Sequence, residues 1–281
     1  MVIIIKKNLS NFLLFINILF LISSIILILN YKLTFIQDLP TNVNITSEAV
    51  IVMDSNTKEV LFEKNAHTKK LTASICKVLT AYTALKYLKL DNYIIVNEQM
   101  VNVEGSKIYL EVGDIVSIET LLYGLMLRSG NDAATALALA YSSNIEDFVY
   151  QMNQIVKSLN LKNSFFENPS GLDGVTNNYS TCYDLAYIMS VALKNETFRK
   201  IISAKTYNDT LPNGKKIYFY NKHRMIHSDS NVIGGKTGYT KKAGRTLITV
   251  FNQNGRELIV ITMDAYNDWN LHRMLVQNYD E

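Results

Sequence analysis

The feature that most constrains this chain lies near its N-terminus, where the eighteen residues from Phe12 to Leu29 carry no charge. As a helix such a run covers about 27 Å, close to the ~30 Å hydrocarbon thickness of a bilayer. Lys6 and Lys7 precede the run and favour a cytoplasmic N-terminus. The sequence therefore predicts a single transmembrane helix, with the rest of the chain outside the cytoplasm.

A cleaved signal peptide is the alternative for this segment, and it would leave a secreted protein. Such a peptide ends at a cleavage site with small residues at alternate positions. After Leu29 the chain continues Asn-Tyr-Lys-Leu-Thr-Phe, where no such site occurs. We favour an uncleaved anchor in the cell membrane, with a cytoplasmic stub and transmembrane helix at 1–35 and a linker at 36–46.

Beyond the linker the hydrophobic period changes twice along the chain. Residues 49–64 alternate as two strands around a polar turn, and strands return from about residue 206, with Asn254-Gly255 as a hairpin turn. Helical periodicity separates these two regions. The expected helices lie at 74–89, 118–140 (interrupted near Ser129), 145–159, 182–193 and 269–279.

This order of elements predicts an α+β fold. We expect an antiparallel sheet, built from both ends of the chain and flanked by helices, with an all-α lobe inserted between them. One catalytic domain would cover 47–281, with 47–90 and 206–281 in the sheet-containing lobe and 91–205 in the helical lobe. Clefts between such lobes are common ligand sites.

Composition excludes several classes of function. The net charge is +3 and no lysine- and arginine-rich run occurs, so we expect no nucleic-acid partner. His223 and His227 are four residues apart, but no glutamate follows His223 as in the zinc motif HExxH. We expect no metal and no cofactor. Cys76 and Cys182 are too few for a disulfide scaffold, and their pairing stays open.

Ser74 and Lys77 form the first of three motifs that point to chemistry. They open the helix expected at 74–89, where positions three apart share a face and the hydroxyl can meet the amine. A lysine acts as a base only when neutral, and burial near another positive charge lowers its pKa. Thr72 is expected to cap this helix. A second Ser-x-x-Lys copy, Ser55 to Lys58, falls in the expected hairpin turn and is interpreted as structural.

Ser129, Gly130 and Asn131 interrupt a helical stretch and form the second motif. Gly130 is expected to permit a tight turn that exposes the two flanking side chains. Ser129 would then relay a proton to a leaving group, and Asn131 would hold a substrate amide. A helix kink is the alternative, and the copy Ser142-Ser143-Asn144 is interpreted as a helix cap.

Lys236, Thr237 and Gly238 form the third motif, at the end of an expected strand. Gly238 leaves one face of the strand open, so that an extended substrate can pair with its edge. Lys236 and Thr237 are candidates for binding a carboxylate, and Lys236 also supplies the positive charge that the base requires nearby. The backbone N–H groups of Tyr239 and Ser74 are candidates for an oxyanion hole.

The three motifs together are the signature of class A β-lactamases and penicillin-binding proteins. From about residue 47 to 276 the chain resembles the low-molecular-mass penicillin-binding proteins, which are serine D-alanyl-D-alanine carboxypeptidases of the peptidase S11 family. Gly130 fits these carboxypeptidases, since β-lactamases usually have aspartate there. The resemblance extends to LTASICKVLTAYTAL, GSKIYLEVGDIVSIETLLYGLMLRSGNDAATALA, FENPSGLDGVTNNYSTCYDLAYI and GGKTGYTKKAGRTLI.

The resemblance implies that Ser74 attacks the carbonyl between two terminal D-alanines of a peptidoglycan stem peptide, while Lys77 accepts its proton. β-Lactams would inhibit by acylating the same serine. Arg245 is a further candidate for the substrate carboxylate, and equally a structural cation. The implied residues are Ser74, Lys77, Ser129 and Asn131 for catalysis, and Lys236, Thr237, Gly238, Tyr239 and Arg245 for substrate binding.

Three alternatives to this activity stay open. A class A-type β-lactamase needs a glutamate to activate the deacylating water, and Glu167 lies in the right stretch of chain but not in that loop. A DD-endopeptidase that cuts cross-links uses the same motifs, and an inactive cell-envelope binding protein would not be acylated. Many family members also carry a β-rich domain and a C-terminal membrane helix; here the N-terminal segment is expected to be the tether.

Overall fold

The computed structural model describes residues 14–26, 45–277 and 279. Residues 14–26 are helical and belong to a unit of their own. Within these three ranges, no helix attains the length and apolar character that crossing a bilayer demands. The remainder of the anchor expected at 1–35, including Lys6 and Lys7, lies outside the described residues, as does most of the expected linker at 36–46.

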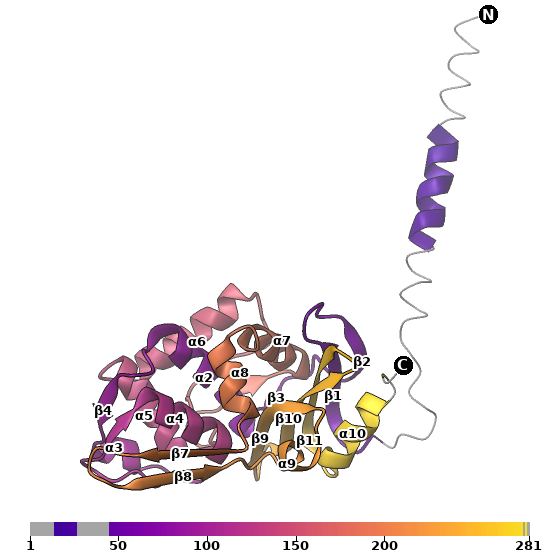
Figure 1. The fold of residues 1–281 in the computed structure, drawn as a ribbon. Helices are drawn as coiled ribbons and strands as arrows, with labels where there is room; N and C mark the ends of the chain where they lie inside the picture. The colour runs from indigo at the N-terminus through magenta and orange to yellow at the C-terminus, as the bar shows by residue number, and fades with distance from the viewer. Residues whose placement is uncertain (1–13, 27–44, 278, 280–281) are drawn as a thin grey trace, which may run out of the picture. The chain divides into compact units, whose positions relative to one another are not determined.

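One five-stranded sheet draws its strands from early and late parts of the chain, as the sequence predicts (Figure 1). Its order is β2-β1-β11-β10-β9, and every neighbouring pair is antiparallel. Asn254 and Gly255 have φ values of 50° and 86°, as the two-residue turn between the last two strands requires. The strands are β1 (Ser47–Asp54), β2 (Val60–Lys64), β9 (Val232–Thr240), β10 (Gly244–Gln253) and β11 (Arg256–Ala265).

Both faces of this sheet pack against an apolar core. In β1, Ala49, Ile51 and Met53 contribute to one core, whereas Val50 and Val52 contribute to the other. This division follows from the two-residue period of a strand, whose successive side chains point to opposite faces. The sheet is therefore a central layer with helices on both sides.

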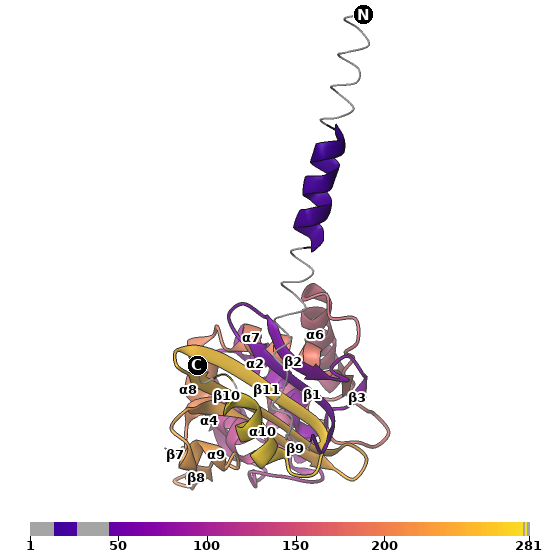
Figure 2. The same ribbon diagram turned by 90° about the vertical axis from the view of Figure 1, so that its right-hand side faces the viewer.

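Most of the helices lie between the two groups of strands, and one more follows the last strand. They are η1 (Ala73–Cys76), α2 (Lys77–Tyr87), α3 (Glu98–Val101), α4 (Ile118–Tyr123), the π-helical turn η2 (Gly124–Arg128), α5 (Asn131–Tyr141), α6 (Ile145–Ser158), α7 (Cys182–Ala192), α8 (Glu196–Ser203), α9 (Met225–Ser228) and α10 (Asp268–Gln277). α7 packs on β1 and β11, and α10 packs on the opposite face (Figure 2). The expectation of an antiparallel sheet flanked by helices is confirmed.

The inserted part of the chain is not purely helical, contrary to the expectation. It contains short strands because β-branched and aromatic residues favour extended backbone, as in the segment Tyr93–Ile95. Within 91–205, β4 (Tyr93–Ile95) pairs with β5 (Ile115–Ser117), and β6 (Tyr179–Ser180) pairs with β3 (Lys70–Leu71) from the earlier part of the chain. A further ladder, β7 (Thr206–Thr210) with β8 (Lys216–Tyr220), lies beyond residue 205, where strands are expected. The division into lobes at residues 90 and 205 stays a prediction.

The helix expected at 74–89 differs in detail at its start. It begins with the 3-10 turn η1 and becomes α-helical at Lys77. Thr72 does not cap it: its side chain accepts no hydrogen bond from the helix, and its backbone is helical (φ −85°, ψ −21°), whereas a capping residue is usually extended. Cys76 and Cys182 are both free and fully buried, and burial raises the pKa of each thiol.

Two buried histidines connect the sheet to α10 and the segment before α9. His223 Nε2 lies 3.1 Å from Thr249 Oγ1, and His272 Nδ1 lies 2.8 Å from the same hydroxyl. The ring of His223 packs edge-on against Trp269. Burial lowers the pKa of His223 to about 3 and holds that of His272 well below its usual range.

We expect the folded chain to lose stability as the pH falls below about 6.5, the pKa of an unperturbed histidine. The unfolded chain then binds protons that the folded chain excludes, so the free energy of unfolding becomes smaller as the pH falls. For His223 alone the loss at pH 5 is about 2 kcal/mol. Urea unfolding from pH 5 to 8 measures this loss, and His67→Gln, at an exposed histidine, is the control that should leave it unchanged. If the free energy of unfolding of His223→Gln depended on pH as strongly as that of the wild type, His223 would not be its source.

Candidate active site

Ser74 lies in η1, where the chain enters α2. The residue before it, Ala73, has φ +46°, a left-handed conformation that costs a non-glycine residue about 1–3 kcal/mol. Ser74 Oγ is 3.0 Å from Nζ of Lys77, whose side chain has no exposed surface. The contact between hydroxyl and amine that the helical spacing predicts is therefore present.

Two more oxygens surround the amine of Lys77. Asn131 Oδ1 lies 2.8 Å from Nζ, and the main-chain oxygen of Ser170 also accepts a hydrogen bond from it. The Asn131 amide is oriented by its own Nδ2, which donates to the oxygen of Glu104 at 2.6 Å. Because a neutral amine has two N–H groups and one lone pair, these two acceptors leave the lone pair for the Ser74 hydroxyl.

The second motif reaches this cavity because η2 is followed by a sharp turn. Ser129 has φ +64° and Gly130 has φ −59°, so the left-handed residue of the turn is the serine. The expectation that Gly130 supplies the turn's conformational freedom is wrong. Gly130 is needed for space, since a Cβ there would lie 2.8 Å from an oxygen of Asp132 and 2.9 Å from Ile108.

Lys236 in β9 brings a second buried amine. Its Nζ donates to Ser129 Oγ at 2.9 Å and to the oxygen of Thr237 at 2.7 Å. Burial lowers the pKa of both amines, that of Lys77 to about 8, and the charge on Lys77 lowers the pKa of Lys236 further. A neutral amine is thus accessible near physiological pH.

Gly238 allows β9 to lie directly against η1. A Cβ on Gly238 would lie 2.3 Å from Thr246 Oγ1 and 2.9 Å from the backbone nitrogen of Ser74. The N–H of Ser74 belongs to the first helical turn, whose donors have no acceptor within the helix. The oxyanion hole expected from the N–H groups of Ser74 and Tyr239 stays a prediction.

Arg245 lies in β10, and its guanidinium is already paired. Nε and Nη2 donate to the buried carboxylate of Asp268 at 3.1 and 3.0 Å. Such a bidentate pair fixes the plane of the guanidinium. Nη1 takes part in neither bond, so Arg245 keeps a donor while Asp268 offsets much of its charge.

Most of the expected site residues line a single cleft of about 250 Å³. Lys77, Asn131 and Lys236 are buried beneath it. The sequence interpretation missed four of the lining residues, Ser106, Lys222, Thr246 and Asp268, which belong to none of the three motifs. The cleft is lined by Ser74, Ser106, Ser129, Lys222, Thr237, Gly238, Tyr239, Arg245, Thr246 and Asp268.

Lys222 and Ser106 meet across the cleft, with Nζ 3.0 Å from Oγ. The backbone N–H of Lys222 donates to the oxygen of Leu127 at 2.9 Å, which fixes its place beside η2. Burial, together with the nearby charge of Arg128, lowers the pKa of Lys222. No local pattern marks Lys222, because only these long-range contacts bring it to the site.

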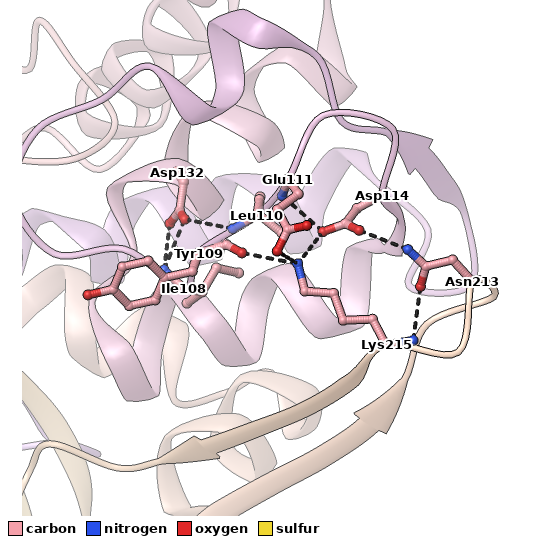
Figure 3. A network of polar contacts seen from close by, with 8 residues as sticks. All are labelled: Ile108, Tyr109, Leu110, Glu111, Asp114, Asp132, Asn213 and Lys215. Atoms are coloured by element: carbon pink, nitrogen blue, oxygen red, sulfur yellow. Dashed lines mark hydrogen bonds and ion pairs between the residues drawn. The ribbon is translucent and has the colours of Figure 1, made fainter.

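Two residues after Ser106, the segment from Ile108 to Leu110 wraps around the carboxylate of Asp132 (Figure 3). The N–H of Ile108 donates to both oxygens of Asp132 at 2.9 Å, and Asp132 is itself buried. Further along the segment, Asp114 accepts a bond of 2.8 Å from Lys215, which follows the β7–β8 turn. Asp132, next to Asn131, and Lys215, in the connection between β7 and β8, therefore both hold the segment that follows Ser106 at the cleft.

A loop over residues 166–178 closes the cavity on another side. The oxygen of Pro169 accepts from Thr80 Oγ1 at 2.7 Å, so the loop is tied to α2. Gly171 has φ +78°, and a Cβ on it would lie only 1.9 Å from the oxygen of Ala73. Glu167 is exposed, accepts from the N–H of Asn177 at 2.7 Å and does not line the cleft, which gives no support to a class A-type deacylation.

The arrangement has the parts of a serine–lysine acyl-transfer site. A neutral amine beside a hydroxyl allows general base catalysis, and a second hydroxyl held by a second amine offers a route for a proton to a leaving group. The open edge of β9 can bind an extended peptide.

Comparisons with known proteins agree with this class of site. The Peptidase S11 family model, described as D-alanyl-D-alanine carboxypeptidase, matches residues 36–267. The D-alanyl-D-alanine carboxypeptidase DacF of Bacillus subtilis (strain 168) is 32% identical over 226 residues, covering 78% of this chain and 57% of the relative. The D-alanyl-D-alanine carboxypeptidase of Streptomyces sp. (strain K15) is 34% identical over 226 residues, covering 74% and 77%.

Solved structures are similar over most of their length. The crystal structure of the Streptomyces K15 DD-transpeptidase has a TM-score of 0.78 at 31% identity, covering 86% of this chain and 99% of that one. The chain belongs to the peptidase S11 family. It spans 57% of the length of DacF.

Replacing Gly171 by alanine is expected to lower the free energy of unfolding by about 2 kcal/mol or more, because the new methyl group overlaps the oxygen of Ala73 and alanine disfavours φ +78°. Urea unfolding at fixed pH measures the loss. Gly174→Ala is the matched control in the same loop, since nothing lies within 4 Å of its added methyl group. Equal stability of the two variants would refute the close packing of the loop on η1.

Proposed function

We propose that this chain is a serine-type D-Ala-D-Ala carboxypeptidase. The observation that carries the proposal is the buried amine of Lys77, with its lowered pKa, 3.0 Å from the hydroxyl of Ser74. Ser74 attacks the carbonyl between the two terminal D-alanines as Lys77 takes its proton. D-Alanine leaves, and water hydrolyses the acyl-enzyme to release the shortened stem peptide.

Ser129 and Lys236 serve the leaving group in this proposal. The hydroxyl of Ser129, held at 2.9 Å by the Lys236 amine, passes a proton to the departing nitrogen of D-alanine. Asn131 orients Lys77 and contacts the substrate amide. The N–H groups of Ser74 and Tyr239 stabilise the oxyanion.

The terminal carboxylate of the substrate is proposed to lie at the other end of the cleft. Thr237 offers a hydroxyl there, the buried amine of Lys236 beside it contributes positive charge from beneath the cleft, and Gly238 leaves room for the peptide beside β9. Arg245 contributes its remaining donor from an orientation fixed by Asp268. Penicillin and other β-lactams acylate Ser74 in the same orientation and inhibit the enzyme.

The Ser74→Ala variant is expected to release D-alanine from a diacyl-D-Ala-D-Ala peptide at least about 10³-fold more slowly than the wild type, since the nucleophile is lost. Enzymatic determination of free D-alanine measures the rate. Ser55→Ala, in the other Ser-x-x-Lys copy, lies between β1 and β2 and retains full activity. Release by the Ser74 variant at the wild-type rate would reject the mechanism.

Transpeptidation is the second candidate, favoured by the neighbouring structure that is named a DD-transpeptidase. There an amine attacks the acyl-enzyme in place of water. Including glycylglycine in the same assay separates the two activities, because transfer gives a longer peptide and hydrolysis gives the free acid. A DD-endopeptidase would instead release material from cross-linked dimers.

We also propose that the segment at 1–35 tethers the enzyme to the cell membrane, with the catalytic domain at 47–281 on the extracytoplasmic side. The uncharged run from Phe12 to Leu29, preceded by Lys6 and Lys7, supports this topology. The substrate, a peptidoglycan stem peptide, lies in the same compartment.

The full chain is expected to stay with bacterial membranes through a carbonate wash and to be digested when protease is added to spheroplasts. The double variant Leu19→Lys, Ile22→Lys makes the segment too polar to span a bilayer, so we expect it in the soluble fraction. Immunoblots of the fractions measure both outcomes. Recovery of the unaltered full chain in the soluble fraction would exclude the anchor.

A further inference from the structure

Asn168 holds the 166–178 loop together from the inside. Its Oδ1 accepts the N–H of Ser170 at 3.1 Å and that of Gly171 at 2.7 Å. Its Nδ2 donates to the oxygen of Leu172 at 3.2 Å and to Thr176 Oγ1 at 3.1 Å. Side-chain oxygens of asparagine commonly close turns in this way. One side chain thus fixes four residues of the loop that closes the cavity.

A single peptide unit connects Asn168 to Lys77. The carbonyl of Ser170 and the N–H of Gly171 belong to the same planar trans amide, so they point in opposite directions. The N–H binds Asn168, and the carbonyl accepts from the Lys77 amine. A rotation of this amide plane that breaks the first contact also turns the second away from Lys77.

We propose that Asn168 is a positioning residue for the acylation of Ser74. Through the Ser170–Gly171 peptide it holds the carbonyl that takes one N–H of neutral Lys77, so that the lone pair of the amine faces the Ser74 hydroxyl. This rests on the proposed function, because it assigns Asn168 a part in the base-catalysed step. Asn168 does not line the cleft and acts on the substrate only through Lys77.

The test is the rate at which fluorescent penicillin labels the full chain. In Asn168→Ala the carbonyl is no longer fixed and the amine turns freely, so we expect labelling to slow about tenfold or more, a part of the 10²–10⁴-fold that general base catalysis supplies. Asn177→Ala is the matched control, since the side chain of Asn177 takes part in none of these contacts.

The pH profile distinguishes positioning from a general loss of structure. Wild-type labelling is expected to rise with pH through about 8, as Lys77 loses its proton. A loosened loop admits water to Nζ and relieves the burial that lowers this pKa, so the rise moves to higher pH in Asn168→Ala. The titratable groups whose charge acts on Lys77 are Cys76, Lys222 and Asp132, and Lys77 in turn acts on Lys236.

Circular dichroism confirms that each variant is folded at the assay temperature. Should Asn168→Ala not fold, Asn168→Leu serves instead, because it keeps most of the side-chain volume and lacks the acceptor that holds the N–H of Gly171. Wild-type rate and pH profile in the folded variant would overturn the proposal. A wild-type chain that is not labelled at all would overturn the proposed function instead, so the two failures are distinguishable.

Discussion

The burial of two lysine amines in one cavity is the constraint on which the rest of the site depends. Removing a charged amine from water costs several kcal/mol, and the oxygens that bind Lys77 and Lys236 in the described part of the chain are hydroxyl, amide and carbonyl oxygens, not carboxylates. Loss of a proton relieves this cost, and the neutral amine is the form that a base requires. The packing that excludes water from the cavity therefore also favours the neutral form of these amines.

The fold supplies this enclosure by placing distant segments of the chain next to one another. β9 lies at the edge of a sheet whose other edge comes from the first strands, and η1 follows those strands almost directly. Gly238 then lets the backbone of β9 approach the nitrogen of Ser74 more closely than any side chain would allow. A strand at an edge, with a glycine at the contact, leaves its outer side free for a peptide that adds as a further strand.

The features that sequence could predict are those determined by neighbouring residues. The Asn254-Gly255 turn and the contact of Ser74 with Lys77 depend on spacings of one to three residues, and both are present. Lys222 gave no such signal, because its place beside Ser106 depends on contacts across more than 100 residues. The turn at Ser129 was interpreted wrongly for a related reason: the neighbours that exclude a side chain at Gly130 include Ile108, from a separate segment.

Backbone strain occurs next to both of the hydroxyls that contact the buried amines. Ala73, before Ser74, and Ser129 itself are both left-handed, at a cost of about 1–3 kcal/mol each. Contacts from distant segments surround both residues. The backbone of Gly171 lies close against the oxygen of Ala73, and Ser129 accepts a hydrogen bond from the Lys236 amine. Ala73 sets the direction of the backbone just before Ser74, and Ser129 carries its hydroxyl on the left-handed residue itself. The strained residues therefore lie where the backbone brings two hydroxyls within hydrogen-bond distance of two buried lysine amines.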